Sequence, residues 1–164
     1  MICKLSHSNI QEILTIVNDA ALAYKEKIPQ DRWKEPYMSI QELKEEINRG
    51  VKFYGWQENE ILLAIMGIQP VGDVTLIRHA YVLTCHQRKR IGEKLLKYLL
   101  NLAQTSKVYV GTWEAAPWAI QFYQKHGFNL VSTEEKNELL KRYWNIPERQ
   151  VETSIVLELK RQHS

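Results

Sequence analysis

The chain has 164 residues, of which 45% are hydrophobic and 25% are charged. This size and composition are typical of one globular domain with a substantial core, so we expect a single domain over residues 1–164. The net charge is only +3 and the lysines and arginines are spread along the chain, which argues against a nucleic-acid partner.

The N-terminal residues and the cysteines argue against several further classes. The first residues, MICKLSHSN, contain no apolar signal core, and no apolar run is long enough to span a bilayer. Cys3 and Cys85 form neither a disulfide framework nor a metal-binding spacing. We therefore expect a cytoplasmic protein that binds no metal and does not associate with a membrane.

The N-terminal part begins with signals for a short strand and a helix. Residues 2–5 are mostly apolar and indicate a strand. Ser8 is a suitable N-cap for a helix that extends to about Tyr24. Apolar residues at helical spacing predict its buried face: Ile10, Ile13, Leu14, Val17, Ala20 and Ala21.

A loop and a second helix are expected next. Residues 28–38 include two prolines and show no regular period, which predicts a loop. Ser39 and Glu42 form a capping box, so the helix that they open should continue to about Gly50.

The remaining strands have clear local signals. Apolar runs bounded by turn residues predict strands over residues 51–56, 61–69, 74–83, 107–113 and 129–132. Alternating apolar and polar residues predict a final strand over residues 151–159.

Two further helices lie among these strands. Leucines at helical spacing predict a helix over about residues 90–104. Pro117 suits the first turn of another helix, which should end at Lys125 and be closed by Gly127. Residues 139–144 form a short, ambiguous segment. Together these elements predict an α/β or α+β sheet domain.

The segment from Tyr81 to Leu96 is the most informative stretch. It leaves a predicted strand, crosses a polar turn and becomes the basic start of a helix. Free N–H groups, the positive end of the helix dipole and three cationic side chains meet there, which suits a phosphate or pyrophosphate. This predicted anion site consists of Gln87, Arg88, Lys89, Arg90, Ile91 and Gly92. The alternative is an ordinary surface helix whose basic first turn is solvated.

The predicted anion site resembles the acyl-CoA-binding motif of the GNAT superfamily of N-acyltransferases, Gln/Arg-x-x-Gly-x-Gly/Ala. Gln87 matches its first position and Gly92 its last, whereas Arg90 stands where the family usually has its first glycine. This resemblance identifies the expected ligand as an acyl-CoA.

A second segment, residues 113–128, resembles the family's Asn-x-x-Ala-x-x-Phe-Tyr-x-x-x-Gly-Phe pattern. The matching residues are Ala119, Phe122, Tyr123, Gly127 and Phe128. Ala116 replaces the usual Asn, which removes one polar group near the cofactor arm.

The resemblance covers nearly the whole chain and implies a fold and a reaction. The fold would be a mixed, mostly antiparallel sheet of about seven strands flanked by helices and splayed between the fourth and fifth strands. Acetyl-CoA would be the cosubstrate: an amide near Val82 would polarise its thioester carbonyl, and Val82 and Leu83 would be among the residues that bind it. The reaction would be acetyl transfer to a primary amine by direct attack in a ternary complex.

Tyr123 and His79 are the catalytic candidates. Tyr123 matches the family's usual general acid, and a phenol can donate a proton at physiological pH; it could instead only pack beside Phe122. His79 lies in an apolar strand and could be a general base, an acceptor contact or a hydrogen-bonded core residue. Strand alternation places it on the opposite face from Arg78. Glu114 could face the same cleft or be a solvated turn residue.

The loop over residues 28–38 is the best candidate for acceptor recognition. Trp33, Glu35 and Tyr37 combine aromatic and acidic groups that suit an amine, and in the resembling family this region usually builds the acceptor pocket. We expect a small-molecule amine as the acceptor. The alternative is a loop whose aromatic residues only cover the edge of the core.

Two other functions are compatible with the sequence. The departures at Arg90 and Ala116 would suit a non-catalytic module that binds or senses acyl-CoA. The aromatic residues of two segments would suit a protein-interaction domain: Trp33, Tyr37, Tyr143 and Trp144. A homodimer is compatible with all three functions.

Overall fold

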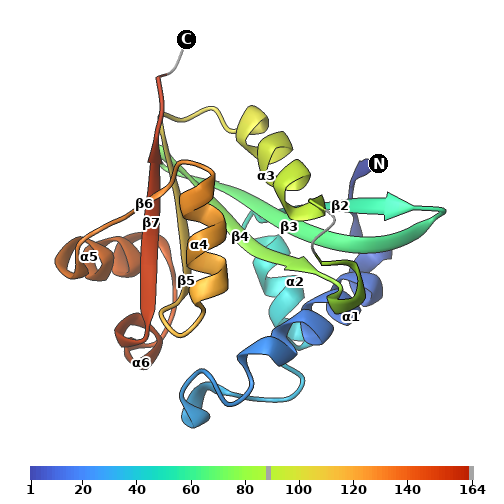
Figure 1. The fold of residues 1–164 in the computed structure, drawn as a ribbon, viewed down its shortest axis with the longest axis horizontal. Helices are drawn as coiled ribbons and strands as arrows, with labels where there is room; N and C mark the ends of the chain where they lie inside the picture. Colours follow the sequence, from blue (N-terminus) through green and yellow to red (C-terminus); the bar gives the residue numbers. More distant parts are fainter. Residues whose placement is uncertain (88–89, 163–164) are drawn as a thin grey trace.

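The computed structural model describes residues 1–87 and 90–162 of the chain, and its core is a mixed β-sheet (Figure 1). The strands are β1 (Ile2–Lys4), β2 (Lys52–Glu58), β3 (Ile61–Val71), β4 (Val74–Val82), β5 (Lys107–Trp113), β6 (Asn129–Leu130) and β7 (Ser154–Lys160). Within the described residues they form one sheet in the order β1-β2-β3-β4-β5-β7-β6. Neighbouring strands are antiparallel, except that β4 and β5 are parallel.

Helices cover both faces of this sheet (Figure 1). They are α1 (Ile10–Ala20), α2 (Ile40–Asn48), α3 (Ile91–Leu102), α4 (Pro117–Lys125), α5 (Thr133–Tyr143) and α6 (Glu148–Glu152). On one face, α3 and α4 pack on the sheet through a cluster that includes Leu95 and Tyr123. On the other face, α1 and α2 pack on β2 and β3 through Ile13 and Phe53. On that same face, α5 packs on β5 and β7 through Leu140.

The centre of the sheet opens between β4 and β5. These two strands pair only from Thr75 to Ile77 on β4 and from Val108 to Val110 on β5. Beyond this short ladder β4 continues to Val82 and β5 to Trp113 without pairing to each other. The predicted sheet, with its splay between the fourth and fifth strands, is therefore confirmed.

A β-bulge in β4 lies next to this opening. The β3–β4 register shifts between Ile65 and Gly67, and His79 has a positive φ of 55°. Such a bulge interrupts the alternation of side chains along a strand. Arg78 and His79 consequently both reach Glu46 of α2, at 2.9 Å and 3.6 Å. The prediction that they face opposite sides of the strand was wrong.

Several predicted boundaries are confirmed, and others need correction. The strand at residues 107–113 and the helix at 117–125 have the predicted bounds. Ser8 does not cap α1, because it lies within a 3-10 turn and Asn9 precedes the helix. The ambiguous segment at 139–144 belongs mostly to α5, whose first turn is capped by Ser132. The final strand begins at Ser154, since α6 occupies the start of the predicted strand.

We predict that Gly67→Ala destabilises the protein by about 1–3 kcal/mol, because β3 has no room for a side chain there. A Cβ at Gly67 would lie 2.8 Å from Val51 Cγ1 and 3.0 Å from the carbonyl oxygen of Arg78. Chemical denaturation measures the change in unfolding free energy. Gly92→Ala is the matched control, because its Cβ would lie 3.6 Å from Phe122, an ordinary contact. Equal stability of the Gly67 variant and the parent would contradict the close packing described around Gly67.

Candidate active site

Two cavities open on opposite faces of the sheet and share two tyrosines. One, the α3–α4 cavity, has a volume of about 620 Å³, and the other, the α2–α6 cavity, about 410 Å³. Tyr24 and Tyr81 line both. Since Tyr81 lies on β4 beyond its ladder with β5, the two cavities approach each other through the opening in the sheet.

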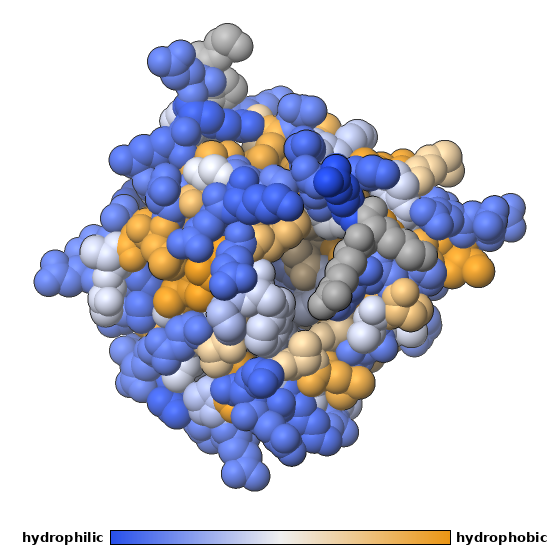
Figure 2. Space-filling model, in the orientation of Figure 1, coloured by the Kyte–Doolittle hydropathy of each residue, from blue (hydrophilic) through white to orange (hydrophobic). Residues whose placement is uncertain are grey.

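The wall of the α3–α4 cavity contains all of the described part of the predicted anion site. On the face seen in Figure 2 the surface is hollowed between α3 and α4. The predicted cofactor residues that line the cavity are Val82, Gln87, Arg90, Ile91, Gly92 and Tyr123. Arg88 and Lys89 lie outside the described residues.

The start of α3 is built to expose backbone N–H groups. Arg90 is the N-cap residue, with φ 61° and ψ 18° in the left-handed region that favours glycine. Its carbonyl oxygen accepts the first helical hydrogen bond from Lys94, so the amides between them have no partner within the helix. Gly92 is among these residues and carries no side chain that would cover them. A phosphate group can therefore approach the first turn closely.

Leu83 is the one predicted cofactor residue in the described part of the chain that is not in the wall of the α3–α4 cavity. It does not line either cavity, and its backbone N–H donates to the carbonyl oxygen of Leu63 at 2.9 Å. Val82 does line the α3–α4 cavity, and its carbonyl oxygen accepts a hydrogen bond from Gln87 Nε2 at 3.3 Å. The contact predicted between Leu83 and the cofactor stays a prediction, and the backbone N–H of Leu83, which the sheet uses, is not available for it.

Tyr123 lies in the wall of the α3–α4 cavity with only 5% of its surface exposed. Its ring makes edge contacts with Phe122 and Phe128, with centroids 5.1 Å and 5.5 Å away. Burial, with a smaller effect of Tyr24, raises the pKa of the Tyr123 phenol above its ordinary value. The phenol therefore stays protonated at neutral pH and can act as a proton donor. The Tyr123 ring can therefore pack against its aromatic neighbours while its hydroxyl acts as a proton donor.

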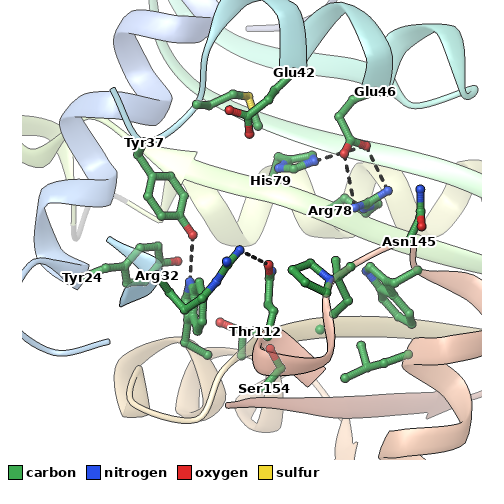
Figure 3. A pocket seen from close by; sticks show the side chains of 18 of the residues that line it. Tyr24, Arg32, Tyr37, Glu42, Glu46, Arg78, His79, Thr112, Asn145 and Ser154 are labelled. Atoms are coloured by element: carbon green, nitrogen blue, oxygen red, sulfur yellow. Dashed lines mark hydrogen bonds and ion pairs between the residues drawn. The ribbon is translucent and has the colours of Figure 1, made fainter. Parts of the chain in front are cut away.

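Three further tyrosines gather where the cavities approach each other. The ring of Tyr24 lies 5.6 Å from that of Tyr37 and 6.4 Å from that of Tyr81. Trp113 Nε1 donates a hydrogen bond of 2.8 Å to the hydroxyl of Tyr37 (Figure 3). Burial is the largest cause that raises the pKa of all three phenols. This part of the site is therefore polar but uncharged at neutral pH.

The α2–α6 cavity has a charged wall on β4 and α2 (Figure 3). Glu46 forms an ion pair with Arg78 and lies 3.6 Å from Nε2 of His79, and all three side chains line the cavity. Burial acts to raise the pKa of Glu46, but His79 and Arg78 together lower it below its ordinary value. Burial is also the main cause that lowers the pKa of His79, so its imidazole is neutral at physiological pH.

The predicted acceptor residues have different positions. Tyr37 lines the α2–α6 cavity, whereas Trp33 and Glu35 line neither cavity. Trp33 stacks on Tyr37 with centroids 5.8 Å apart, and its Nε1 donates to Glu35 at 3.3 Å. Glu35 also pairs with Lys25 at 3.2 Å. Trp33 therefore contacts both Tyr37 and Glu35, and direct contact of Trp33 and Glu35 with an acceptor stays a prediction.

Sequence reasoning did not single out Tyr24, Tyr81 or Arg32 as site residues. Arg32 lines the α2–α6 cavity from the same loop as Tyr37. Its position beside Trp33 in the predicted acceptor loop could have identified Arg32 as a site residue. No sequence feature could have identified Tyr24 and Tyr81, because they meet only after α1 packs on β4. Glu114, the other candidate base, is exposed and lines neither cavity.

Other kinds of site find no support in the described part of the chain. Over residues 1–87 and 90–162, no group of three His, Cys, Asp or Glu side chains is placed to hold a metal ion. In the same residues, no helix combines the length and the apolar character needed to cross a membrane. The residues present fit an elongated anionic cofactor, because an apolar cavity leads from the start of α3 to the opening in the sheet.

A comparison with family models identifies one match. The model described as "Acetyltransferase (GNAT) domain" matches residues 15–141. That range includes β2 to β5, the predicted anion site and Tyr123. No curated protein matches the chain.

Many solved structures share the fold at low sequence identity. The PaiA N-acetyltransferase from Thermoplasma acidophilum, in complex with coenzyme A, is 17% identical with a TM-score of 0.74, and 98% of each chain is covered. The ribosomal-protein-S18-alanine N-acetyltransferase from Escherichia coli is 15% identical with a TM-score of 0.69, covering 100% of this chain and 95% of that one.

A larger protein contains the same fold as one part. N-acetylglutamate synthase from Neisseria gonorrhoeae, complexed with coenzyme A and N-acetyl-glutamate, is 16% identical with a TM-score of 0.68. The match covers 99% of this chain and 35% of that one. At these identities the similar structures establish the fold alone.

The buried tyrosines predict a loss of stability at alkaline pH. Tyr24, Tyr37, Tyr81 and Tyr123 have raised pKa values in the folded protein, whereas unfolded phenols titrate near pH 10, roughly. The folded state therefore binds more protons than the unfolded state above that pH, and the unfolding free energy falls as pH rises. Below it, these groups should cause no pH dependence.

The measurement is a pH titration that follows tyrosinate absorbance and circular dichroism in the same sample. We expect these four phenols to ionise only as the helical signal is lost. Ionisation of all tyrosines while the fold persists would show that the phenols are not shielded as described.

Proposed function

Because this chain belongs to the acetyltransferase (GNAT) family, we propose that it is an acetyl-CoA-dependent N-acetyltransferase that acts on a small-molecule amine. The observation that carries the proposal is the pair of cavities on opposite faces that share Tyr24 and Tyr81. One cavity can hold a cofactor and the other an acceptor. Direct transfer requires this arrangement, since both molecules must be bound at once.

The α3–α4 cavity suits the cofactor. The first-turn amides beside Gly92, together with Arg90 and Gln87, would hold its pyrophosphate, and the sequence adds the cations Arg88 and Lys89. When bound, acetyl-CoA supplies the acetyl thioester. The coenzyme A named in two of the similar structures supports this assignment.

Two residues of the chain can donate and accept the protons of the reaction. The amine nitrogen bonds to the acetyl carbon as the carbon–sulfur bond breaks; nitrogen loses a proton and the departing sulfur gains one. Tyr123 Oη holds a proton in the wall of the cofactor cavity. His79 is neutral and lies in the wall of the acceptor cavity beside Glu46, so it can accept the proton from nitrogen.

A small-molecule acceptor suits the second cavity. The α2–α6 cavity is bounded by the acceptor loop, α2, β4 and the segment from Trp144 to Gln150, and its volume is about 410 Å³. Such a volume lies in the range of small-molecule sites. The names of the similar structures include molecules as different as a ribosomal protein alanine and N-acetyl-glutamate. The acceptor class is therefore argued from this cavity.

The first test is a calorimetric titration with acetyl-CoA of the parent protein and of Arg90→Glu. We expect saturable binding by the parent and binding weakened about tenfold or more by Arg90→Glu, which reverses the charge of a side chain at the cavity wall. Arg90 is exposed, so unfolding midpoints should not fall.

Release of free thiol with a panel of amines then tests turnover. Binding of acetyl-CoA without turnover of any amine would favour an acyl-CoA-sensing module. Absence of binding by the parent protein would contradict the proposed function altogether.

Tyr123→Phe should lower kcat by about 100-fold while acetyl-CoA affinity changes much less. The substitution keeps the ring that packs against Phe122 and Phe128 and removes only the hydroxyl. Tyr98→Phe is the matched control, because Tyr98 lies on α3, is 40% exposed and lines neither cavity. Steady-state kinetics and calorimetry on both variants separate catalysis from binding. Full activity of Tyr123→Phe would remove this hydroxyl from the mechanism.

A further inference from the structure

Among the described residues, the charged groups of the α2–α6 cavity leave two cations without a carboxylate partner, Arg32 and Arg49, and Arg49 is exposed. Lys34 pairs with Glu42, and Arg78 pairs with Glu46. Arg32 also lines the cavity and is only partly exposed. Over residues 1–87 and 90–162, no carboxylate lies within ion-pair distance of its guanidinium.

The hydrogen bonding of Arg32 is also incomplete. One terminal nitrogen donates to Gln150 Oε1 on α6 at 3.3 Å. Its Nε is buried and, among the described residues, has no hydrogen-bond partner. A charged group that keeps an unpaired donor is costly to bury, so a ligand acceptor that reaches the terminal nitrogens of this guanidinium would be stabilised.

The position of Arg32 fits a ligand that bridges the cavity. Figure 3 shows Arg32 on one wall, with His79 and Arg78 on the other. Tyr24 and Tyr81 mark the end that approaches the cofactor cavity. An amine placed near these tyrosines would leave the rest of the molecule within the space that Arg32 lines.

We propose that Arg32 binds a carboxylate of the acceptor, so that the substrate class is an amino acid or a similar amine with an acidic group. A guanidinium presents donors in a planar fork that matches a carboxylate, and such bonds are among the strongest in proteins. The inference rests on the proposed transferase function. It deepens that function by naming what the acceptor carries besides its amine.

A structural role for Arg32 makes a different prediction. Arg32 and Gln150 connect the acceptor loop to α6, and the neighbouring pair Asp31 and Arg149 makes the same connection at 3.2 Å. Arg149 is not among the residues that line the cavity. Arg149→Gln therefore weakens the connection without removing the cation from the cavity, and it is the matched control for Arg32→Gln.

The experiment compares amino acids with amines that lack only the carboxylate: phenylalanine with phenethylamine, leucine with isopentylamine and glutamine with 4-aminobutanamide. The readout is the ratio of kcat/KM within each pair, measured with acetyl-CoA. We expect at least one amino acid to be preferred, and Arg32→Gln to lower that preference by about 10- to 100-fold. Arg32→Lys should restore part of it, and Arg149→Gln should leave the ratio unchanged.

Several outcomes would overturn the assignment. They are the absence of any preference for the amino acid, a preference that Arg32→Gln leaves intact, and an equal loss in Arg32→Gln and Arg149→Gln. If no amine is turned over, the same pairs are titrated into protein saturated with coenzyme A. Tighter binding of the amino acid, lost in Arg32→Gln, would then contradict transferase activity and retain the carboxylate site. Equal binding of both members would overturn the site.

Discussion

The short ladder between β4 and β5 is the constraint on which the rest of the structure depends. Three residue pairs hold these parallel strands together. Beyond these pairs, β4 and β5 separate from each other. Separated strands in the middle of a sheet expose backbone groups and apolar surface that must be covered. Helices α3 and α4 cover the opening from one face, and the elements around the α2–α6 cavity cover it from the other. The site is therefore a consequence of how the sheet is built.

The bulge at His79 adapts the acceptor side to this opening. By turning Arg78 and His79 toward the same helix, it allows both to pair with Glu46. A single carboxylate on α2 thus fixes the position of two β4 side chains beside the opening. The positive φ of His79 is unfavourable for a residue with a Cβ, and the contacts with Glu46 and Phe53 hold it in place. In this wall of the α2–α6 cavity, the charges of Arg78 and Glu46 therefore neutralise each other without a ligand.

Elements with strong local signals were predictable from the sequence, and those that depend on tertiary contacts were not. Pro117 and Gly127 enclose α4, so its bounds follow from the chain itself. Helix α5 is mostly polar, and its few apolar residues are explained only by the packing of Leu140 and Trp144 over Gly111. The face of His79 could not be predicted either, because a bulge depends on the register with β3. Even so, the order of strands and helices was enough to predict the fold.

The two sides of the site differ in the same way. The cofactor side is built largely from one continuous region, β4 to α4, so its residues recur at fixed spacing and can be read as motifs. The acceptor side combines the loop around Arg32, α2, β4 and the segment that leads into α6. Arg32 and Gln150 are 118 residues apart, and no spacing rule connects them. For this reason the proposed cofactor could be inferred from sequence motifs. The proposed acceptor could be inferred only from side chains that the fold brings together.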